Sequence, residues 1–305
     1  MNDVHEVFSL SGICVPSLKN LSPCVTITTI ITDTGIERRD SMYQFESRVR
    51  YSEVDSERHL TLPAVMDYLQ DCCTFQSEDM NIGVEYLAEQ KQAWVLSSWE
   101  IKIRRYPVMG EKICVETWPY AFKGFYGYRN FRITNGQGEE LVLANSVWVY
   151  MDMERMRPMR IPEKVADAYR PEIGEELPGE WGARKLSVPE GGTEMPPVPV
   201  AGFFIDTNHH MNNGKYILVA KESVPEDFAI GGVRAEYRRA AMLGDVLYPV
   251  VAVAEEKITV VLTDGGDQIY AIEELMENED RDEIRRISEV KSDQKSRIWS
   301  LSGGA

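Results

Sequence analysis

The sequence predicts an α+β protein built from two similar units, each an antiparallel sheet with one helix against it. A strand, a helix and a run of strands follow one another twice along the chain. A short polar motif precedes each helix, and a proline-rich stretch separates the units. The length of 305 residues agrees with roughly two domains, and the hydrophobic share of 43% is typical of a globular chain.

The charge balance excludes several classes of partner. The chain has 33 Lys and Arg residues against 49 Asp and Glu residues, a formal net charge of −16. Proteins that bind nucleic acid or dock on anionic lipid need the opposite sign. No apolar run approaches the roughly 18 residues of a membrane span. We therefore expect neither nucleic acid nor membrane among the partners.

The cysteine pattern predicts reduced thiols and a cytoplasmic protein. The five cysteines are odd in number, irregularly spaced and without a CxxC pair, which fits neither a disulfide frame nor a zinc site. Asp3 and Glu6 stand where a secretion signal would carry positive charge. Because phosphate-binding and dinucleotide motifs are also missing from the sequence, we expect no metal and no cofactor.

The first unit is predicted over residues 42–161. A strand over 44–50 precedes a helix over 62–78, for which Thr61 is the candidate N-cap and Pro63 lies in the first turn. In the next strand, Val95, Trp99, Ile101 and Ile103 are expected on one side. An NGQG turn joins the last two strands of the unit. The four strands are predicted over residues 94–103, 113–118, 126–133 and 141–153.

A linker over residues 162–200 and a second unit over 201–275 follow. Seven prolines among glycine and glutamate predict an extended linker. The second unit repeats the element order, with a helix over 213–223. Its strands are predicted over residues 233–240, 247–255, 257–263 and 268–275. The ends lie outside both units: residues 1–41 are an extension or precede a true start at Met42, and residues 276–305 are a charged tail.

An internal repeat relates the two units. Asp55 and His59 precede the first helix, and Asp206 and His210 precede the second, each pair separated by three residues and followed by an apolar one. Further along, an Arg-Arg pair is followed by Gly and an acidic residue in both units. Two matches in the same order favour a duplicated unit.

The duplicated unit resembles a hotdog fold, in which an antiparallel sheet wraps a central helix. The stretches YSEVDSERHLTLPAVMDYLQD and WVLSSWEIKIRRYPVMGEKICVETW are similar to the N-terminal hotdog of acyl-acyl-carrier-protein thioesterases. FFIDTNHHMNNGKYILVAKES and EYRRAAMLGD are similar to their C-terminal hotdog. The resemblance, over about residues 43–250, implies a hydrolase that releases free fatty acid from acyl carrier protein without a cofactor.

Asp206, Asn208 and His210 are the predicted catalytic residues. In an extended chain, alternate side chains point the same way, which would gather a carboxylate, an amide and an imidazole before a helix N-terminus. Histidine can move a proton near neutral pH. The resemblance implies that these positions are functional, with Asn208 positioning water and Asp206 orienting the segment. The alternative is a polar turn that only caps the helix.

One departure from the family pattern concerns the residues after EYRR. Plant members carry a catalytic glutamate there, often followed by a cysteine, whereas this chain has Ala240 and Ala241. Glu236 lies about 13 Å earlier on the strand, too far to substitute. Cys72 and Cys73 belong to the apolar stripe of the first helix. The sequence therefore favours direct attack by water with His210 as base.

Two further sets of residues are predicted from the resemblance. For the acyl chain, with ordinary core as the alternative, these are Met66, Leu69, Cys73, Trp94 and Leu96. For docking of the acidic carrier protein, with solvated strand ends as the alternative, these are Arg104, Arg105, Arg238 and Arg239. A monomer or a homodimer is expected. The competing functions are an acyl-coenzyme A thioesterase, a hotdog dehydratase or hydratase, and an acyl-binding module with weak or lost catalysis.

Overall fold

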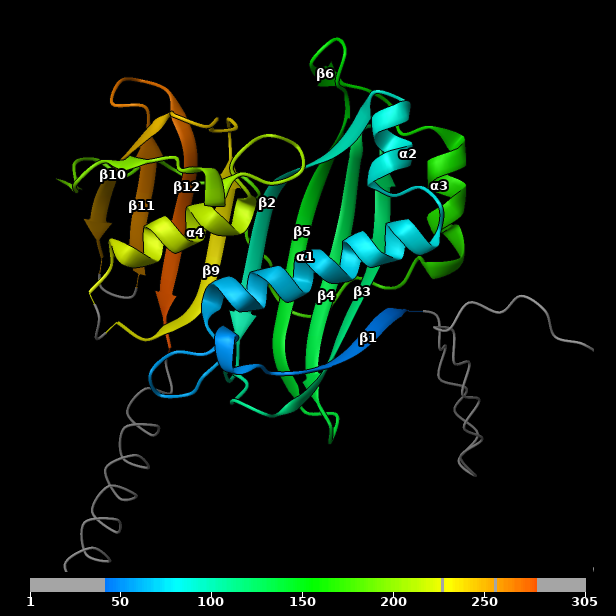
Figure 1. Ribbon diagram of the computed structural model, residues 1–305, viewed down its shortest axis with the longest axis horizontal. Helices are drawn as coiled ribbons and strands as arrows, with labels where there is room; N and C mark the ends of the chain where they lie inside the picture. The colour runs from blue at the N-terminus through cyan, green and yellow to red at the C-terminus, as the bar shows by residue number, and fades with distance from the viewer. Residues whose placement is uncertain (1–41, 226–227, 255–256, 279–305) are drawn as a thin grey trace, which may run out of the picture. The chain divides into compact units, whose positions relative to one another are not determined.

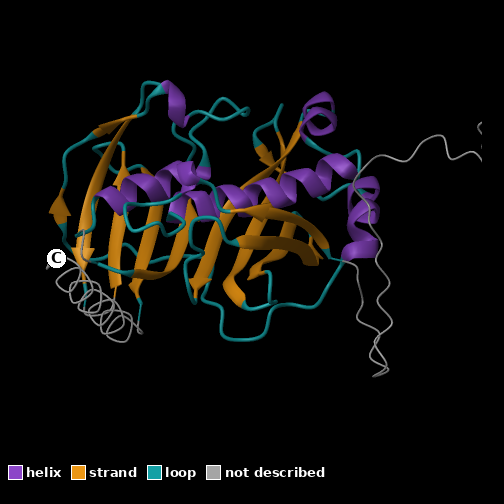
Figure 2. Ribbon diagram, turned by 60° about the horizontal axis from the view of Figure 1, so that its bottom comes forward, coloured by secondary structure: helices purple, strands orange, loops and turns teal. Residues whose placement is uncertain are grey.

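A computed structural model describes residues 42–225, 228–254 and 257–278, which belong to one compact unit. A twelve-stranded sheet carries the two long helices on one face, which confirms the predicted α+β class (Figure 1). Figure 2 shows these helices lying together on one side of the strands. The extension over 1–41 and most of the predicted tail lie outside the described residues.

The first half supplies one end of the sheet. Its strands and helices are β1 (Tyr43–Arg48), α1 (Leu62–Asp79), α2 (Val84–Glu89), β2 (Gln92–Ile103), β3 (Lys112–Lys123), β4 (Tyr126–Asn135), β5 (Glu140–Asp152) and β6 (Arg157–Pro158). The spatial order is β1-β3-β4-β5-β2, with β6 pairing with β5. The predicted NGQG turn is confirmed, because the Asn135 side chain accepts the backbone N–H groups of Gln137 and Glu139.

Helix α1 begins and ends close to its predicted limits. The Thr61 hydroxyl accepts the backbone N–H of Ala64, and Pro63 lies in the first turn, where no hydrogen bond is lost. The apolar stripe, including Val65, Met66 and Leu69, is fully buried against the sheet. Local capping and tertiary burial therefore favour the same helix.

The predicted alternation in β2 is wrong at Val95. A β-bulge at Ser97 inserts one residue opposite β5, between the pairs Leu96–Trp148 and Ser98–Val147. An extra residue reverses which side chains face the core. Leu96 is therefore buried with Trp99, while Val95 is exposed.

The predicted linker is not extended throughout. It contains α3 (Glu163–Tyr169), a short 3₁₀ turn (Arg170–Glu172), β7 (Thr193–Glu194) and β8 (Val198–Pro199). Its later residues also contact the face of the sheet that lies opposite the long helices. The Trp118 indole donates to the Glu175 carbonyl, and Glu100 accepts the backbone N–H of Gly182. The later part of the linker thus lies on one face while α1 and α4 lie on the other, and α3 packs beside α2.

The second half repeats the pattern with shorter elements. These are a 3₁₀ turn (Gly202–Phe204), α4 (Asn213–Glu222), β9 (Ile230–Tyr237), β10 (Val246–Val253), β11 (Lys257–Thr263) and β12 (Ile269–Glu277). Helix α4 agrees with the predicted helix, and its N-cap Asn212 accepts the backbone N–H of Gly214. The first residues of the predicted tail belong to β12.

The halves meet edge to edge at β2 and β9. Trp99 pairs with Ala235 and Ile101 pairs with Val233 in an antiparallel ladder. All four residues are buried in the hydrophobic cluster that contains α1 and α4. One sheet and one main core therefore run through both halves, and the N-termini of the two helices lie near this junction (Figure 1).

Candidate active site

The motif before α4 forms a tight turn, so the extended chain predicted over Asp206–His210 is wrong. The backbone N–H of Asp206 donates to the His210 carbonyl (3.0 Å), and the N–H of His209 returns to the Asp206 carbonyl. His209 adopts a left-handed conformation with φ of 63°. The Asp206 carboxylate accepts the backbone N–H of Asn208 at 2.8 Å, and this internal hydrogen bond stabilises the turn.

The first half contains the same turn. Asp55 exchanges the corresponding backbone hydrogen bonds with His59 and Arg58, and its carboxylate accepts the N–H of Glu57. Arg58 takes the left-handed position of His209, with φ of 71°. The repeated motif is therefore a repeated three-dimensional unit, which supports the duplication inferred from the sequence.

His210 lies between a carbonyl and a carboxylate. Its Nδ1 is 3.3 Å from the Met211 carbonyl oxygen and 3.8 Å from Asp206 Oδ1. A neutral imidazole that donates from Nδ1 to that carbonyl keeps the Nε2 lone pair free as an acceptor. The side chain remains one-quarter exposed.

The structure brings Asp206 and His210 together and places Asn208 at the exposed side of the turn. Asn212, which the sequence analysis did not select, caps α4 and accepts a hydrogen bond from Gln70 of α1 at 3.4 Å. The Asn-Asn pair directly before a helical pattern was the available signal. Asn212 therefore ties the candidate catalytic turn to the first half.

Ala240 and Ala241 lie in the chain segment beside His210. The Ala241 carbonyl accepts the N–H of Met211 (2.8 Å), and its own N–H donates to the Tyr216 hydroxyl (2.7 Å). Ala240 is exposed next to this ladder. The position at which plant relatives of the resembled family carry a glutamate is therefore adjacent to His210 but holds only a methyl group here.

Glu236 is directed to the opposite face of the sheet. Its carboxylate accepts the backbone N–H of Leu186 in the linker and pairs with Arg238 at 3.0 Å. In the first half, the position that follows the Arg-Arg pair is Tyr106, which packs against the main core. Burial raises the pKa of this phenol, and the charge of Asp55 adds to the effect.

Four of the five predicted acyl-chain residues lie in one cluster. Met66, Leu69 and Leu96 are buried in the main core, and Cys73 packs against it. Trp94 belongs instead to a separate cluster with Tyr150, so the structure does not bring it to the other four. Burial raises the pKa of the Cys73 thiol, which keeps the sulfur neutral and argues against its use as a nucleophile.

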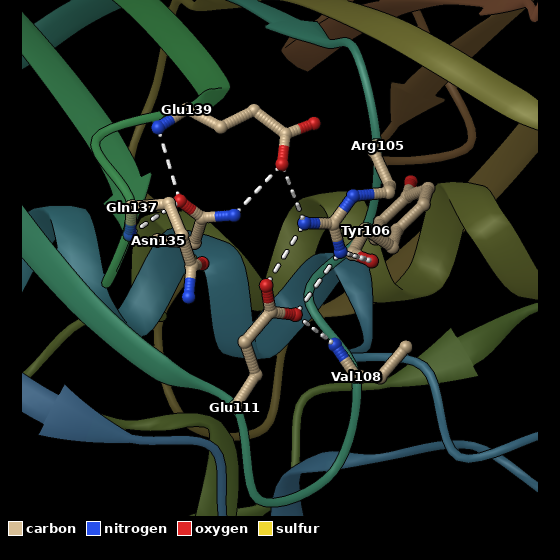
Figure 3. Close-up of polar contacts among 7 residues, drawn as sticks. All are labelled: Arg105, Tyr106, Val108, Glu111, Asn135, Gln137 and Glu139. Carbon is tan, nitrogen blue, oxygen red and sulfur yellow. Dashed lines mark hydrogen bonds and ion pairs between the residues drawn. The ribbon is translucent and has the colours of Figure 1, made fainter.

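Each predicted docking arginine already contacts a carboxylate. Arg105 is held by Glu111 at 2.8 Å and Glu139 at 3.2 Å, as Figure 3 shows. These hydrogen bonds raise the pKa of Arg105 and lower that of Glu111. The other three pairs are Arg104–Glu140, Arg238–Glu236 and Arg239–Asp264. The four side chains stay partly exposed, with much of their charge balanced locally.

Among the described residues, no group of three or more His, Cys, Asp or Glu side chains could hold a metal ion. Within the same part of the chain, no helix is long and apolar enough to cross a membrane.

Two half-sheets, each with its own helix on the same face and its own Asp–His turn, define the class as a tandem hotdog protein. Comparisons with known proteins agree. Residues 40–169 match the acyl-ACP thioesterase N-terminal domain. Among solved structures, an acyl-ACP thioesterase from Bacteroides thetaiotaomicron superposes with a TM-score of 0.71 at 22% identity, covering 78% of this chain and 98% of that one. The 12:0-ACP thioesterase from Umbellularia californica gives 0.69 at 21%, covering 80% and 99%.

Sequence relatives point the same way. An acyl-[acyl-carrier-protein] hydrolase from Cuphea viscosissima is 26% identical over 254 residues, which are 78% of this chain and 60% of that protein. A palmitoyl-acyl carrier protein thioesterase from Cuphea hookeriana is 28% identical over 77% of this chain and 59% of its own length. The chain thus spans about three-fifths of these relatives. Over about three-quarters of its length the chain is therefore similar to acyl-ACP thioesterases.

Proposed function

We propose that the chain is an acyl-[acyl-carrier-protein] thioesterase that hydrolyses the thioester and releases free fatty acid. The observation that carries the proposal is the Asp206–His210 turn at the N-terminus of α4, in which Nδ1 of the imidazole lies beside the Met211 carbonyl and the side chain stays one-quarter exposed. The relatives are named as hydrolases of acyl carrier protein esters.

In the proposed mechanism, His210 Nε2 takes a proton from the attacking water while the water oxygen bonds to the thioester carbon. The helix N-terminus stabilises the negative charge that develops on the carbonyl oxygen. The C–S bond then breaks, and the imidazolium returns its proton to the departing sulfur. Asp206 fixes the turn and faces the imidazolium at 3.8 Å. Asn208, on the exposed side of the turn, is the candidate for orienting the water.

Because Ala240 ends in a methyl group, no second carboxylate stands at this position, and the mechanism has one general base, His210. A positioned base contributes about 10²–10⁴-fold to the rate. A thioester is an activated acyl group, so this contribution supports turnover without the second carboxylate. The same methyl group is the observation that favours the second candidate, an acyl-binding module with weak catalysis.

The proposal extends to partner and location. The acyl group would arrive on acyl carrier protein rather than on coenzyme A, and the acidic composition and irregular cysteine spacing support a cytoplasmic protein free of nucleic acid and membrane. A joined pair of hotdogs within one chain supports a monomer, with a homodimer as the alternative.

A matched panel of acyl carrier protein and coenzyme A thioesters tests the function. Released thiol and free acid would be measured for the wild type and for His210→Ala, with His59→Ala as the control in the duplicated turn. We expect carrier-selective hydrolysis that is lost in His210→Ala and retained in His59→Ala. Turnover that survives in a folded His210→Ala protein would refute the site. Binding without hydrolysis would favour the acyl-binding module.

A further inference from the structure

The buried hydroxyl of Tyr216 lies near the candidate catalytic turn and has no part in the proposed chemistry. Tyr216 stands near the start of α4 and is 2% exposed. Its hydroxyl accepts the backbone N–H of Ala241 at 2.7 Å. Burial raises the pKa of this phenol to about 12, and the charge of Asp206 is among the further causes, which places the phenol close to the turn. The hydroxyl is therefore a neutral polar group inside the core.

A short path of hydrogen bonds connects this hydroxyl to His210. The Ala241 carbonyl accepts the N–H of Met211 at 2.8 Å, and the Met211 carbonyl lies 3.3 Å from His210 Nδ1. Ala241 and Met211 are fully buried, so water does not reach them to replace a lost partner. The contact at Nδ1 is close to the upper limit of a hydrogen bond, and a displacement of about 0.3 Å would break it. Small movements of the Ala241 segment therefore reach the imidazole.

The Tyr216 ring packs against the ring of Tyr237. The two rings meet edge to face, with centroids 5.6 Å apart and planes at 70°. The Tyr237 hydroxyl donates to the carbonyl of Asn213, the first residue of α4, at 3.0 Å. One phenol thus contacts the start of the helix and the other contacts the segment that contains Ala241. Packing within the protein fixes the position of the Tyr216 hydroxyl.

The first half offers an internal comparison for the contact between Tyr216 and Ala241. Pro107 stands at the position of Ala241, and both carbonyls accept the N–H of the residue that follows the histidine of the turn. Four residues after the N-cap of each helix stand Val65 in α1 and Tyr216 in α4. Proline has no N–H to pair, and the helix position that matches Tyr216 is apolar there. The phenol therefore occurs in the half whose segment has an N–H to satisfy, which is also the half with the candidate catalytic histidine.

We propose that Tyr216 is a positioning residue for His210. Its hydroxyl, acting through Ala241 and Met211, holds the carbonyl that keeps the imidazole proton on Nδ1 and leaves the Nε2 lone pair available as a base. This inference rests on the proposed function, and Tyr216 acts through these residues and not on the substrate. Without the hydroxyl, the buried Ala241 N–H must find another acceptor, and the segment carries the Met211 carbonyl away from Nδ1. The proton then moves to Nε2 in part of the molecules, and these molecules lack the base.

Phenylalanine substitutions test the proposal. Tyr216→Phe removes the hydroxyl and keeps the ring. Tyr150→Phe is the matched control, because that phenol is also buried and donates to Gln92 at 2.7 Å in a separate core cluster. The double variant Tyr216→Phe with Ala241→Pro copies the first half, where no N–H needs a partner at this position. Both kcat and KM would be measured on carrier protein thioesters for every variant.

Nitrogen NMR of isotope-labelled histidine gives a readout that does not depend on turnover. In mildly alkaline buffer the imidazole is neutral, and the shifts of its two nitrogens identify the tautomer. His210→Ala assigns the signals among the four histidines of the chain. We expect the wild type and Tyr150→Phe to carry the proton on Nδ1 of His210. In Tyr216→Phe the tautomer ratio should shift several-fold toward Nε2.

Tyr216→Phe should also lower kcat by about 10-fold or more at an unchanged KM, because a misplaced base slows the chemical step. The double variant should recover most of that loss. An unchanged tautomer ratio in Tyr216→Phe, an equal loss of kcat in Tyr150→Phe, or no recovery in the double variant would overturn the proposal. If Tyr216→Phe does not fold, the double variant decides, since a proton on Nε2 there would contradict the path through Ala241. Absent turnover with a tautomer shift confined to Tyr216→Phe would refute the proposed function alone.

Discussion

Replacing Glu273 by glutamine should stabilise the protein, and the gain should grow with pH. Glu273 of β12 is fully buried on the helix-covered face, opposite Ala235 and Val260. Neither carboxylate oxygen has a hydrogen-bond partner among the described residues. Burial raises the pKa of Glu273 well above its ordinary value of 4.5. The folded protein therefore keeps a proton that the unfolded chain releases.

The magnitude follows from proton linkage. Above pH 4.5 the unfolded state binds fewer protons than the folded state, so this group lowers the free energy of unfolding by about 1.4 kcal/mol per pH unit, up to the pKa of the folded state. Glu273→Gln removes that slope. The variant should therefore gain on the wild type as the pH rises from 5.5, by about 1.4 kcal/mol for each pH unit that lies below the folded-state pKa, because all other groups titrate alike in both.

Urea unfolding at pH 5.5, 6.5 and 7.5 checks this expectation. Glu274→Gln is the matched control on the adjacent residue, whose carboxylate faces the other side of the sheet and pairs with Arg234 at 2.8 Å and with Lys257 at 2.5 Å. Its loss should lower stability at pH 7.5 because two cations lose their partner. A constant difference between Glu273→Gln and the wild type at the three pH values would refute the reasoning.

Three further changes test local features. Thr61→Ala should cost about 1 kcal/mol in urea unfolding through loss of the α1 N-cap, and an unchanged midpoint would contradict that role. Gly174→Ala should cost about 1–3 kcal/mol and lower Tm, because the new methyl group would overlap the Trp118 ring; an unchanged Tm would show that the linker moves aside without a measurable cost. Ala240→Glu should raise kcat/KM on carrier protein thioesters by restoring a carboxylate beside His210, whereas reduced activity in a folded variant would contradict a vacant position.

Local signals made much of the fold predictable. Thr61 and Pro63 define the start of α1 through hydrogen bonding and a fixed φ, which depend on neighbouring residues alone. The bulge at Ser97 was not predictable in this way, because its extra residue is defined against the partner strand β5. Helix α3 was missed because the prolines around it outweighed its short helical pattern.

The candidate site was predictable in composition and not in geometry. The motif correctly joined Asp206 to His210 in one segment, but the left-handed conformation of His209 turns that segment back on itself. Non-glycine residues adopt this conformation when surrounding hydrogen bonds enforce it, here those of Asp206. The arginine–carboxylate pairs Arg104–Glu140 and Arg239–Asp264 depend on contacts between distant elements, which spacing along a sequence does not contain.

The β2–β9 ladder makes each half a permanent partner of the other. If the two halves were produced as separate chains, each would carry an unpaired strand edge next to apolar core residues, a surface prone to indiscriminate pairing. The linker removes that hazard because it holds the two edges at an effective concentration in the millimolar range. Covalent joining also lets the halves differ. Both keep the Asp–His turn, but the position beside it is the exposed Ala240 in the second half and Tyr106, packed against the core, in the first.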